Sequence, residues 1–228
     1  MRAFIIIIKI TYNTKGYILC KNIETQDELF VDSEMEFIRG SFEQLAGTCT
    51  RDDVTMAGPR FLKNYTDIDN TGISLSNRGI VKNALGLNRI DGASLDRFLC
   101  SMDVEAISGR CIALKKSVFD KLGGFDDSLS NLYKGVDFSI KSSNEIPQGN
   151  IVIDPTVEVR ILDIANDDSI QTDKENEALI RKWPYISDIS VSSYNCNLDM
   201  YKPIDLLNYS SYEIFIFKVK RKLKRIFA

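Results

Sequence analysis

The chain has 228 residues, of which 44% are hydrophobic, and a formal net charge of −3. This composition is typical of one globular domain, with or without a tail. The absence of histidine excludes Ser-His-Asp and Cys-His catalysis and His-ligated zinc. The five cysteines include no Cys-x-x-Cys pair, so we expect free thiols in a reducing compartment and a cytoplasmic protein.

The charge is distributed unevenly along the chain. Six of the 29 basic residues lie in the last eleven positions, where no acidic residue lies, and the preceding part carries 23 basic against 32 acidic residues. Phosphate backbones bind clustered Lys and Arg side chains. The acidic body therefore argues against nucleic acid as a partner, and the basic tail is a separate feature.

Short apolar runs alternate with helical patterns in the first half of the chain. Except at Lys9, Phe4–Ile10 is an apolar, β-branched run, which predicts a strand covered on both faces. A second short strand is expected at Leu29–Val31, and a helix is expected at Phe42–Cys49. Val54–Gly58 predicts another strand, which Pro59 is expected to stop.

The second half continues this alternation. Residues 63–94 are rich in Asn, Asp, Gly, Ser and Thr, and we expect a long loop there with a short strand near Ile73–Leu75. The later expected elements are helices at Ser117–Leu122, from about Val136 and at Thr172–Lys182, and a strand at Ile151–Ile153 that ends at Asp154-Pro155. Alternating strands and helices predict an α/β fold, whose ligands bind beyond the carboxyl ends of the strands.

One segment, from residue 104 to residue 141, carries an ordered set of motifs. A strand-like run ends at Ser108-Gly109, a short helix stops at Gly123-Gly124, Phe125-Asp126-Asp127 follows, and Lys134-Gly135-Val136-Asp137 comes next. This order resembles the acceptor-side half of family-2 glycosyltransferases, which have the nucleotide-sugar-binding GT-A fold. Their pattern is a Ser/Thr-Gly strand, a Val-Phe helix, Gly-Gly-Phe-Asp-Glu and an acidic Glu-Asp-x-Asp cluster. The resemblance implies a partial GT-A, Rossmann-like mixed sheet flanked by helices.

Asp32 and Glu34 follow the Leu29–Val31 strand at an i, i+2 spacing. Two acids at the end of a strand can converge on one hard cation, and Mg²⁺ takes one or two carboxylates together with substrate phosphates. The family carries Asp-x-Asp at this place. The resemblance therefore implies that Asp32 and Glu34 bind a nucleotide sugar through Mg²⁺ or Mn²⁺. Two exposed acids in a turn are the alternative.

The resemblance also implies a site for a glycan acceptor. In the family the glycine-rich turn shapes the acceptor pocket, which gives Gly109, Gly124, Phe125 and Asp126 as acceptor-binding candidates. Asp126 would accept hydrogen bonds from sugar hydroxyls. A local alternative is a helix C-cap, with glycine in the left-handed conformation and Phe125 packing back onto the helix.

The acidic cluster of the family is altered in this chain. Its Glu-Asp pair falls on Lys134 and Gly135, and an ammonium group carries its proton at neutral pH and cannot accept another. A positioned base contributes roughly 10²–10⁴ in rate, so we expect impaired transfer. Asp137 matches a later acid and could act as the base only if the backbone shifted, whereas an exposed helix start is the alternative for this segment. The metal-site histidine of the family falls on Ile161, and Glu158 and Asp163 are substitute ligands to consider.

The resemblance begins inside the family's domain. The chain starts at what resembles the third strand, without the two βα units that supply most of the nucleotide-base contacts. In the family the first strand pairs with the strand before Asp-x-Asp, so Leu29–Val31 is expected to have an unpaired edge. We therefore expect a protein partner that completes the sheet, or a fragment of low stability.

The tail has apolar residues at helical spacing between Tyr212 and Phe227, with basic residues at the other positions. A basic amphipathic helix of this kind can lie on an anionic membrane surface. The candidates for membrane contact are Lys218, Lys220, Arg221, Lys222, Lys224 and Arg225. We expect a location in the cytoplasm, peripheral at the inner face of the membrane, and a helix docked on its own domain is the alternative.

These features predict three segments: a truncated GT-A-like domain at 1–165, a helical and loop extension at 166–210, and a basic amphipathic tail at 211–228. The predicted function is a family-2-like glycosyltransferase of surface-polysaccharide biosynthesis. Its ancestral activity would transfer a sugar from a nucleotide sugar to a glycan acceptor, and this chain is expected to be catalytically impaired. The alternative is a non-catalytic GT-A-like scaffold or partner subunit that binds a glycan, a membrane or an active glycosyltransferase.

Overall fold

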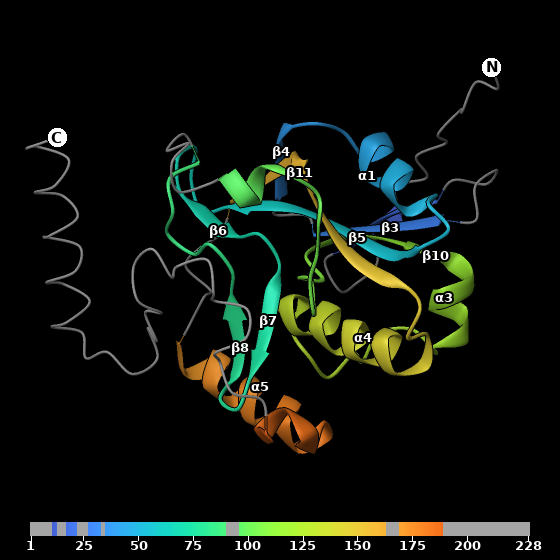
Figure 1. Cartoon of the computed structure of the whole chain (residues 1–228), viewed down its shortest axis with the longest axis vertical. Helices are drawn as coiled ribbons and strands as arrows, with labels where there is room; N and C mark the ends of the chain where they lie inside the picture. Colours follow the sequence, from blue (N-terminus) through green and yellow to red (C-terminus); the bar gives the residue numbers. More distant parts are fainter. Residues whose placement is uncertain are drawn as a thin grey trace, which may run out of the picture. The chain divides into compact units, whose positions relative to one another are not determined.

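The computed structural model describes residues 11–12, 17–21, 27–32, 35–89, 96–162 and 169–188. The chain divides into two compact units, Met1–Ile189 and Ser190–Ala228, and all described residues belong to the first. The expected strand at Phe4–Ile10 and the expected basic helix of the tail lie outside the described residues. The first unit is a mixed α/β structure in which helices flank a sheet (Figure 1).

A mixed sheet forms the centre of this unit. Its strands follow the order β1-β2-β3-β10-β5-β11-β4, with β6 paired to β5 and β9 paired to β11. These strands are β1 (Thr11–Tyr12), β2 (Tyr17–Lys21), β3 (Asp27–Asp32), β4 (Met35–Arg39), β5 (Val54–Leu62), β6 (Ile68–Asn70), β9 (Met102–Asp103), β10 (Cys111–Lys115) and β11 (Asn150–Ile161). A separate hairpin joins β7 (Ile73–Ser76) and β8 (Gly79–Lys82).

Four α-helices accompany the strands in the described part of the chain. They are α1 (Phe42–Cys49), α3 (Lys116–Lys121), α4 (Asn131–Glu145) and α5 (Ser169–Lys182). Short 3-10 helices lie at Asp96–Leu99 and Pro184–Asp188. The expected strand at Leu29–Val31 is confirmed within β3, and the expected helix at Phe42–Cys49 is confirmed as α1.

Three strands end at the same edge of the sheet. β10 is antiparallel to both β3 and β5, and β11 is parallel to β5, so β3, β5 and β11 run in one direction. They end at Asp32, Leu62 and Ile161. Because α/β proteins bind ligands beyond the carboxyl ends of such strands, this edge is where a site is expected.

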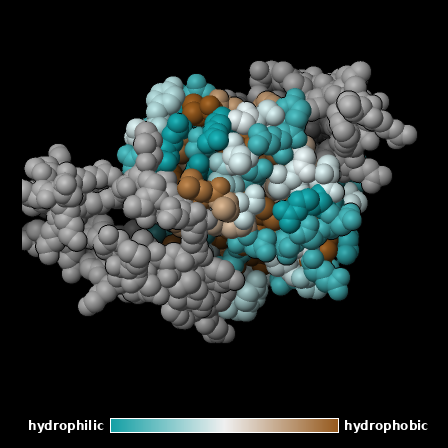
Figure 2. All heavy atoms as spheres, turned by 45° about the horizontal axis from the view of Figure 1, so that its top comes forward, coloured by the Kyte–Doolittle hydropathy of each residue, from teal (hydrophilic) through white to brown (hydrophobic). Residues whose placement is uncertain are grey.

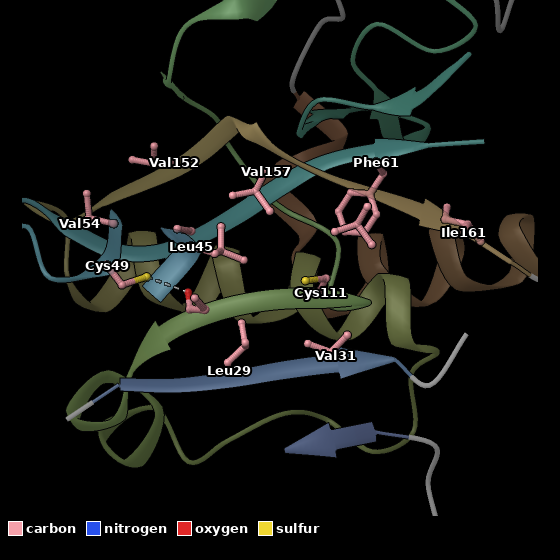
Figure 3. Close-up of a cluster of buried hydrophobic side chains, with 13 residues drawn as sticks. Leu29, Val31, Leu45, Cys49, Val54, Phe61, Cys111, Val152, Val157 and Ile161 are labelled. Atoms are coloured by element: carbon pink, nitrogen blue, oxygen red, sulfur yellow. Dashed lines mark hydrogen bonds between the residues drawn. The ribbon is translucent and has the colours of Figure 1, made fainter. Parts of the chain in front are cut away.

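Helix α1 covers one face of the sheet through its buried residues Leu45 and Cys49 (Figure 3). The thiol of Cys49 donates to the carbonyl oxygen of Ala113 at 3.1 Å. Ser41 forms the N-cap of the helix, and its hydroxyl accepts from the backbone N–H of Gln44 at 3.3 Å. A serine in this position satisfies one of the unpaired N–H groups of the first turn, which explains where α1 begins.

Helices α3 and α4 lie on the opposite face. Val118 of α3 and Phe138 of α4 pack with Ile112 and Leu114 of β10, whereas Ala113 between them belongs to the cluster on the side of α1. Successive side chains of a strand point to opposite faces, so β10 separates α1 from α4 (Figure 1).

Helix α5 belongs to the same unit, because it shares a buried cluster with α4 and the β7–β8 hairpin. Leu75 and Ile80 of the hairpin, Tyr133 of α4 and Leu179 of α5 are members of this cluster. The side-chain oxygen of Asn176 on α5 also accepts from the backbone N–H of Ile80 at 3.1 Å. The hairpin is therefore attached to α5 by both apolar and polar contacts.

Two prolines that we expected to end strands lie within them instead. β5 continues through Pro59, and β11 continues through Pro155. Asp154 lies opposite Pro59 and the next pair is Glu158 with Arg60, so the register of the two strands shifts at this point. A proline has no N–H to donate to a ladder, but a bulge tolerates it. Both predicted strand ends were therefore wrong.

Two further expectations need correction in detail. The region 63–94 contains the short strand expected near Ile73–Leu75, but it also contains β6 and β8, so it is more regular than a long loop. The helix expected from about Val136 begins earlier, at Asn131. As a result, the residues aligned with the acidic cluster of the family lie inside α4.

β3 has a partner strand on each side. β2 pairs with it antiparallel over Tyr17–Lys21, and β10 pairs with it antiparallel on the other side. The expectation of an unpaired edge at Leu29–Val31 was wrong, because the chain supplies its own neighbouring strand. No second protein is needed to complete the sheet at this strand.

The surface drawn in Figure 2 is mostly hydrophilic and carries separate hydrophobic spots. The large apolar side chains that are exposed within the described residues are Tyr65, Leu85, Leu99, Leu162 and Tyr185. Single exposed apolar residues are normal on protein surfaces and indicate no binding site by themselves.

Candidate functional site

Asp32 lies at the end of β3, where three segments meet. Its backbone N–H donates to the carbonyl oxygen of Arg110 at 2.7 Å, and its carboxylate accepts from the side-chain amide of Asn131 at 2.9 Å. These contacts join the end of β3, the turn before β10 and the first residue of α4. Glu34 lies outside the described residues, so its place beside Asp32 is untested.

The turn before β10 touches the backbone of α4 at Gly109. A Cβ atom on Gly109 would lie 2.4 Å from the carbonyl oxygen of Asn131 and 2.6 Å from the nitrogen of Gly135. A Cβ atom on Gly135 would lie 2.1 Å from the nitrogen of Gly109. Carbon atoms at contact distance are about 3.5–4.0 Å apart, so neither position has room for a side chain. A carboxylate side chain, which the family has at the position that aligns with Gly135, would not fit there in this structure.

Hydrogen bonds hold this turn against α4. The hydroxyl of Ser139 donates to the carbonyl oxygen of Gly135 at 2.7 Å and accepts from the backbone N–H of Ile107 at 3.2 Å. Ser108 is 1% exposed, and its hydroxyl accepts from the backbone N–H of Arg110 at 3.3 Å. The close approach of Gly109 and Gly135 is therefore fixed from both sides.

Lys134 is a buried residue of α4, with 5% of its surface exposed. Its ammonium group lies 3.5 Å from a carboxylate oxygen of Asp127. The alternative of an exposed helix start at Lys134–Asp137 was wrong, because α4 begins at Asn131 and its second turn is buried. Lys134 therefore places a cation, and no proton acceptor, at the position that aligns with the first acid of the family cluster.

Asp137 is completely buried on the same helix. One of its carboxylate oxygens accepts from the indole N–H of Trp183 at 2.9 Å and lies 2.9 Å from the ammonium group of Lys182. The other oxygen lies 3.7 Å from the ammonium group of Lys141. Asp137 therefore anchors the end of α5, and its carboxylate is not exposed.

Lys182 also binds Asp126, with 2.6 Å between the ammonium nitrogen and a carboxylate oxygen. Hydrogen bonds from Lys182 and then from Ser128 hold the pKa of Asp126 well below its usual range. Burial opposes the charge of Lys182, but its bonds to Asp126 and Asp137 outweigh burial and raise the pKa of Lys182. One cation thus links two candidate acids from different segments.

Further contacts of α5 reach the start of α4. The carboxylate of Glu175 accepts from the backbone N–H of Ser130 at 2.7 Å and from its hydroxyl at 2.8 Å. The side-chain oxygen of Asn176 accepts from the hydroxyl of Tyr133 at 2.7 Å. These contacts were not predicted, because they join residues 45 and 43 positions apart in the sequence and no local pattern indicates them.

The glycine-rich turn after α3 has the geometry of a helix C-cap, which was the alternative to an acceptor site. Gly123 and Gly124 have φ values of 75° and 77°, the left-handed conformation expected after a helix. The ring of Phe125 packs against Phe30 and Phe119, with centroid distances of 4.8 Å and 5.2 Å. Phe125 thus packs in an aromatic cluster with Phe30 and Phe119. Acceptor binding by this turn and by Gly109 stays a prediction.

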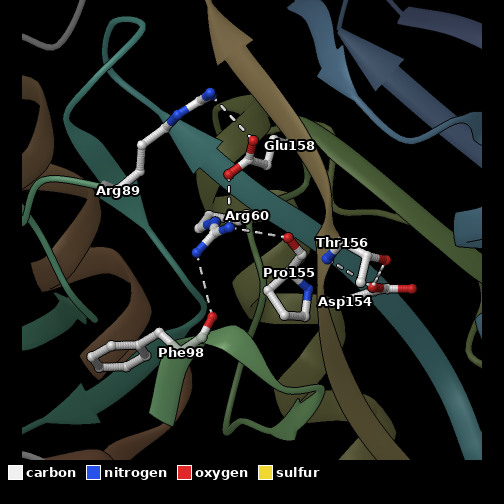
Figure 4. A network of polar contacts seen from close by, with 7 residues as sticks. All are labelled: Arg60, Arg89, Phe98, Asp154, Pro155, Thr156 and Glu158. Carbon is white, nitrogen blue, oxygen red and sulfur yellow. Dashed lines mark hydrogen bonds and ion pairs between the residues drawn. The ribbon is translucent and has the colours of Figure 1, made fainter. Parts of the chain in front are cut away.

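The described residues offer few ligands for a cation. No three side chains of His, Cys, Asp or Glu come together among them. Ile161 packs in the buried cluster on the side of α1, and Glu158 is paired with Arg60 at 2.7 Å and Arg89 at 3.1 Å (Figure 4). Because two guanidinium groups already use its carboxylate, Glu158 does not replace the missing metal ligand. Asp32 is the remaining carboxylate of the predicted metal site within the described residues.

The predicted membrane contacts, from Lys218 to Arg225, lie outside the described residues. Within the described part, no helix is both long enough and apolar enough to cross a membrane.

No protein-family model matches the sequence, and no curated protein matches it significantly. Among solved structures, the chain is similar to GalNAc-T7, in a crystal structure with UDP, GalNAc and Mn²⁺. The TM-score is 0.49 and the sequence identity is 15%. The match covers 69% of this chain and 32% of that chain, so this chain spans about a third of the length of GalNAc-T7.

Proposed function

We propose that this protein is a GT-A-like relative of the family-2 glycosyltransferases that acts in surface-glycan assembly as a binding subunit, without transferring sugar. The motif order from Ser108-Gly109 through Gly123-Gly124-Phe125-Asp126 supports the proposed relation to the family-2 glycosyltransferases. The mixed sheet, with Asp32 at a carboxyl end, is compatible with it. Nucleotide sugar and glycan are the proposed ligands.

The main support for the proposed loss of sugar transfer is the contact between Gly109 and Gly135. Inverting transfer needs a carboxylate that takes the proton of the acceptor hydroxyl, and such a base contributes roughly 10²–10⁴ in rate. At position 135 a side chain would meet the backbone of the neighbouring turn at 2.1 Å. The adjacent Lys134 is a cation, and the carboxylate of Asp137 is held by Lys182 and Trp183.

Mg²⁺ or Mn²⁺ is proposed at Asp32 when a nucleotide sugar is bound. Such a cation would neutralise the diphosphate, and it commonly takes one or two protein carboxylates with substrate phosphates. Asp32 can supply one carboxylate, and the amide of Asn131 holds that carboxylate at 2.9 Å. Glu34 is proposed as the second ligand.

Titration calorimetry with UDP-, GDP- and dTDP-sugars in the presence of Mn²⁺ tests this proposal on the full chain. We expect one nucleotide sugar to bind, and Asp32→Ala to weaken that binding by about tenfold or more, since charged contacts are worth about 1.5–3 kcal/mol. Asp52→Ala, which changes an exposed acid before β5, is the matched control.

The same samples are assayed for release of the nucleoside diphosphate in the presence of lipid-linked and free glycan acceptors. Our expectation is binding without turnover. Sugar transfer by the purified chain at an enzymatic rate would contradict the proposed loss of activity. Failure of all three nucleotide sugars to bind would contradict the donor site at Asp32.

We also propose that the protein is cytoplasmic and peripheral at the inner face of the membrane. The support is the composition of the tail, in which each basic residue near an anionic surface adds about 1 kcal/mol of attraction. Sedimentation with vesicles containing anionic lipid, compared between the full chain and a chain ending at residue 210, tests this. Equal sedimentation of the two chains would contradict it.

A further inference from the structure

Two arginines bind one glutamate, and a third arginine lies opposite it in the strand register, where β4, β11 and β5 lie side by side. In the strand register, Glu158 of β11 lies opposite Arg39 of β4 and opposite Arg60 of β5. The guanidinium group of Arg60 donates to one carboxylate oxygen of Glu158 at 2.7 Å, and Arg89 donates to the other at 3.1 Å (Figure 4). We name Arg39, Arg60, Arg89 and Glu158 the arginine cluster.

The arginine cluster has an excess of positive charge. Its three arginines and one glutamate give a net charge of +2. In the part of the chain that the structure describes, no carboxylate pairs with Arg39, and the nearest acid along β4, Glu36, is bound to Arg160 at 2.7 Å. The neighbouring pair of Glu36 and Arg160 is neutral, so it leaves the excess uncompensated.

Arg60 is buried, with 3% of its surface exposed. Its guanidinium also donates to the carbonyl oxygens of Pro155 at 3.2 Å and Phe98 at 3.4 Å, but its buried Nε has no hydrogen-bond partner within the described residues. Burial lowers the pKa of Arg60; Glu158 opposes this effect, and the charges of Arg89 and Arg39 add to it. A buried cation is costly unless anions and acceptors surround it.

The backbone around Glu158 is irregular on both sides. The register of β11 shifts against β5 between Asp154 and Glu158, and it shifts against β4 between Glu158 and Val159. Bulges redirect side chains and occur often beside functional sites. The cluster also lies near the carboxyl ends of the parallel strands β5 and β11, where α/β sheets bind ligands.

Solvent reaches two members of the cluster. Arg39 is exposed and the side chain of Arg89 is 27% exposed, whereas the side chains of Arg60 and Glu158 are 4% and 3% exposed. A ligand would therefore contact Arg39 and Arg89 first. Glu158, which is itself held by Arg60, fixes the position of Arg89. Such an arrangement keeps an arginine in place before the ligand arrives, which lowers the entropy lost on binding.

We propose that the arginine cluster binds a phosphate group, as a phosphate monoester or a diphosphate. Arginine guanidinium groups bind phosphate oxygens in pairs of parallel hydrogen bonds, and a phosphate monoester carries a charge of about −1.5 to −2 at neutral pH, which matches the excess. The site is distinct from Asp32, because three strand spacings of about 4.8 Å put roughly 14 Å between β3 and β11. It does not depend on the proposed function.

Calorimetric titration of the full chain with inorganic pyrophosphate, without metal, tests the site. We expect Arg39→Gln and Arg89→Gln each to raise the Kd by about tenfold, since each variant loses hydrogen bonds from a charged donor to the phosphate oxygens. Arg181→Gln makes the same change of charge on the exposed face of α5 and is expected to leave the Kd within about twofold. Arg60 is not changed, since its loss would leave Glu158 buried beside a single cation.

The basic tail is a second place where pyrophosphate could bind, so the double variant Lys222→Gln/Arg225→Gln is titrated in parallel. A Kd that rises only in the tail variant, an equal Kd in all the arginine variants, or no binding to the unmodified chain would overturn the proposal. Asp32→Ala is expected to bind pyrophosphate normally, which separates this result from that of the donor site. Displacement by uridine monophosphate would assign the site to a nucleotide phosphate, and displacement by phosphatidic acid vesicles to a lipid headgroup.

Discussion

Lys182 is the single residue on which the arrangement of the candidate acids depends most. Its ammonium group lies 2.6 Å from Asp126 and 2.9 Å from the fully buried Asp137. Removing the cation leaves Asp137 with the indole of Trp183 and with Lys141 at 3.7 Å. Since an acid that loses its partner in the interior is strongly destabilising, this contact is expected to matter for stability before it matters for binding.

Lys182→Met should lower the free energy of unfolding at neutral pH by about 2 kcal/mol, less than for a fully buried pair because solvent screens an exposed side chain. The side chain of Lys182 is 34% exposed. Urea unfolding followed by circular dichroism measures the change. Lys174→Met, on the exposed face of the same helix, is the control and is expected to change stability by less than about 0.5 kcal/mol.

Acid should reduce the difference in the free energy of unfolding between the unmodified chain and Lys182→Met, because the pKa of Asp126 is lowered in the folded protein. As the pH falls, the Asp126 carboxylate takes up a proton in the unfolded chain before it does so in the folded protein. The stability that Asp126 contributes is therefore complete above its unfolded pKa of about 3.9 and is lost as the pH falls below that value. The gap between the unmodified chain and Lys182→Met is therefore expected to narrow below pH 4, roughly. A gap that stays constant or widens would contradict the ion pair.

Some of these residues were predictable and others were not, for a physical reason. The left-handed glycines after α3 follow from the local sequence, since Gly-Gly at the end of a helical pattern is itself the signal. The bond between Lys182 and Asp126 joins positions 56 residues apart. Periodicity reports on contacts within one element, so it carries no information on such a pair.

Helix α4 depends, as an element, on the absence of a side chain at Gly135. Gly135→Ala would place a Cβ atom 2.1 Å from the nitrogen of Gly109, so the helix and the turn before β10 would have to separate. We expect a loss of about 3 kcal/mol or more, the upper range for overpacking. Gly47→Ala is the matched control, because Gly47 lies in α1 and a Cβ atom there meets nothing within 4 Å.

Thermal or urea unfolding of the two alanine variants tests the contact. Gly47→Ala should be neutral or should stabilise the protein by about 0.5–1 kcal/mol, the difference in helix propensity. If both variants changed stability in the same direction by similar amounts, the close approach of Gly109 and Gly135 would be excluded, and with it the main argument for the loss of transfer.

The elements of the sheet show where prediction from sequence ends. β3 and α1 were predictable because an apolar run and a short helical pattern are local signals. The ends of β5 and β11 were not, because a proline stops a strand in a regular ladder and is accepted at a register shift. Whether a shift exists depends on the partner strand, which the local sequence does not reveal.

The position of α5 decides, for the whole molecule, what can fold independently. The segment boundary expected at residue 165 places this helix outside the first domain. In the structure α5 contributes the fully buried Leu179 to the cluster with α4, and its Glu175 binds the N–H of Ser130 just before α4. The first compact unit ends at Ile189. The motif resemblance did not indicate which later helix completes the core.

A chain ending at residue 165 and a chain ending at residue 189 should therefore differ sharply. The shorter chain loses the buried Leu179 and Ile186 and exposes the apolar side of α4 that they cover. Each buried side chain of this kind contributes about 1.5–3 kcal/mol, so we expect the shorter chain to lose at least about 3 kcal/mol of stability. The longer chain should unfold in one cooperative step in urea, and its α4 amides should resist hydrogen exchange. Equal urea midpoints for the two chains would show that the domain folds without α5. The acids that Lys182 binds would then be accessible in a folded protein that lacks this helix.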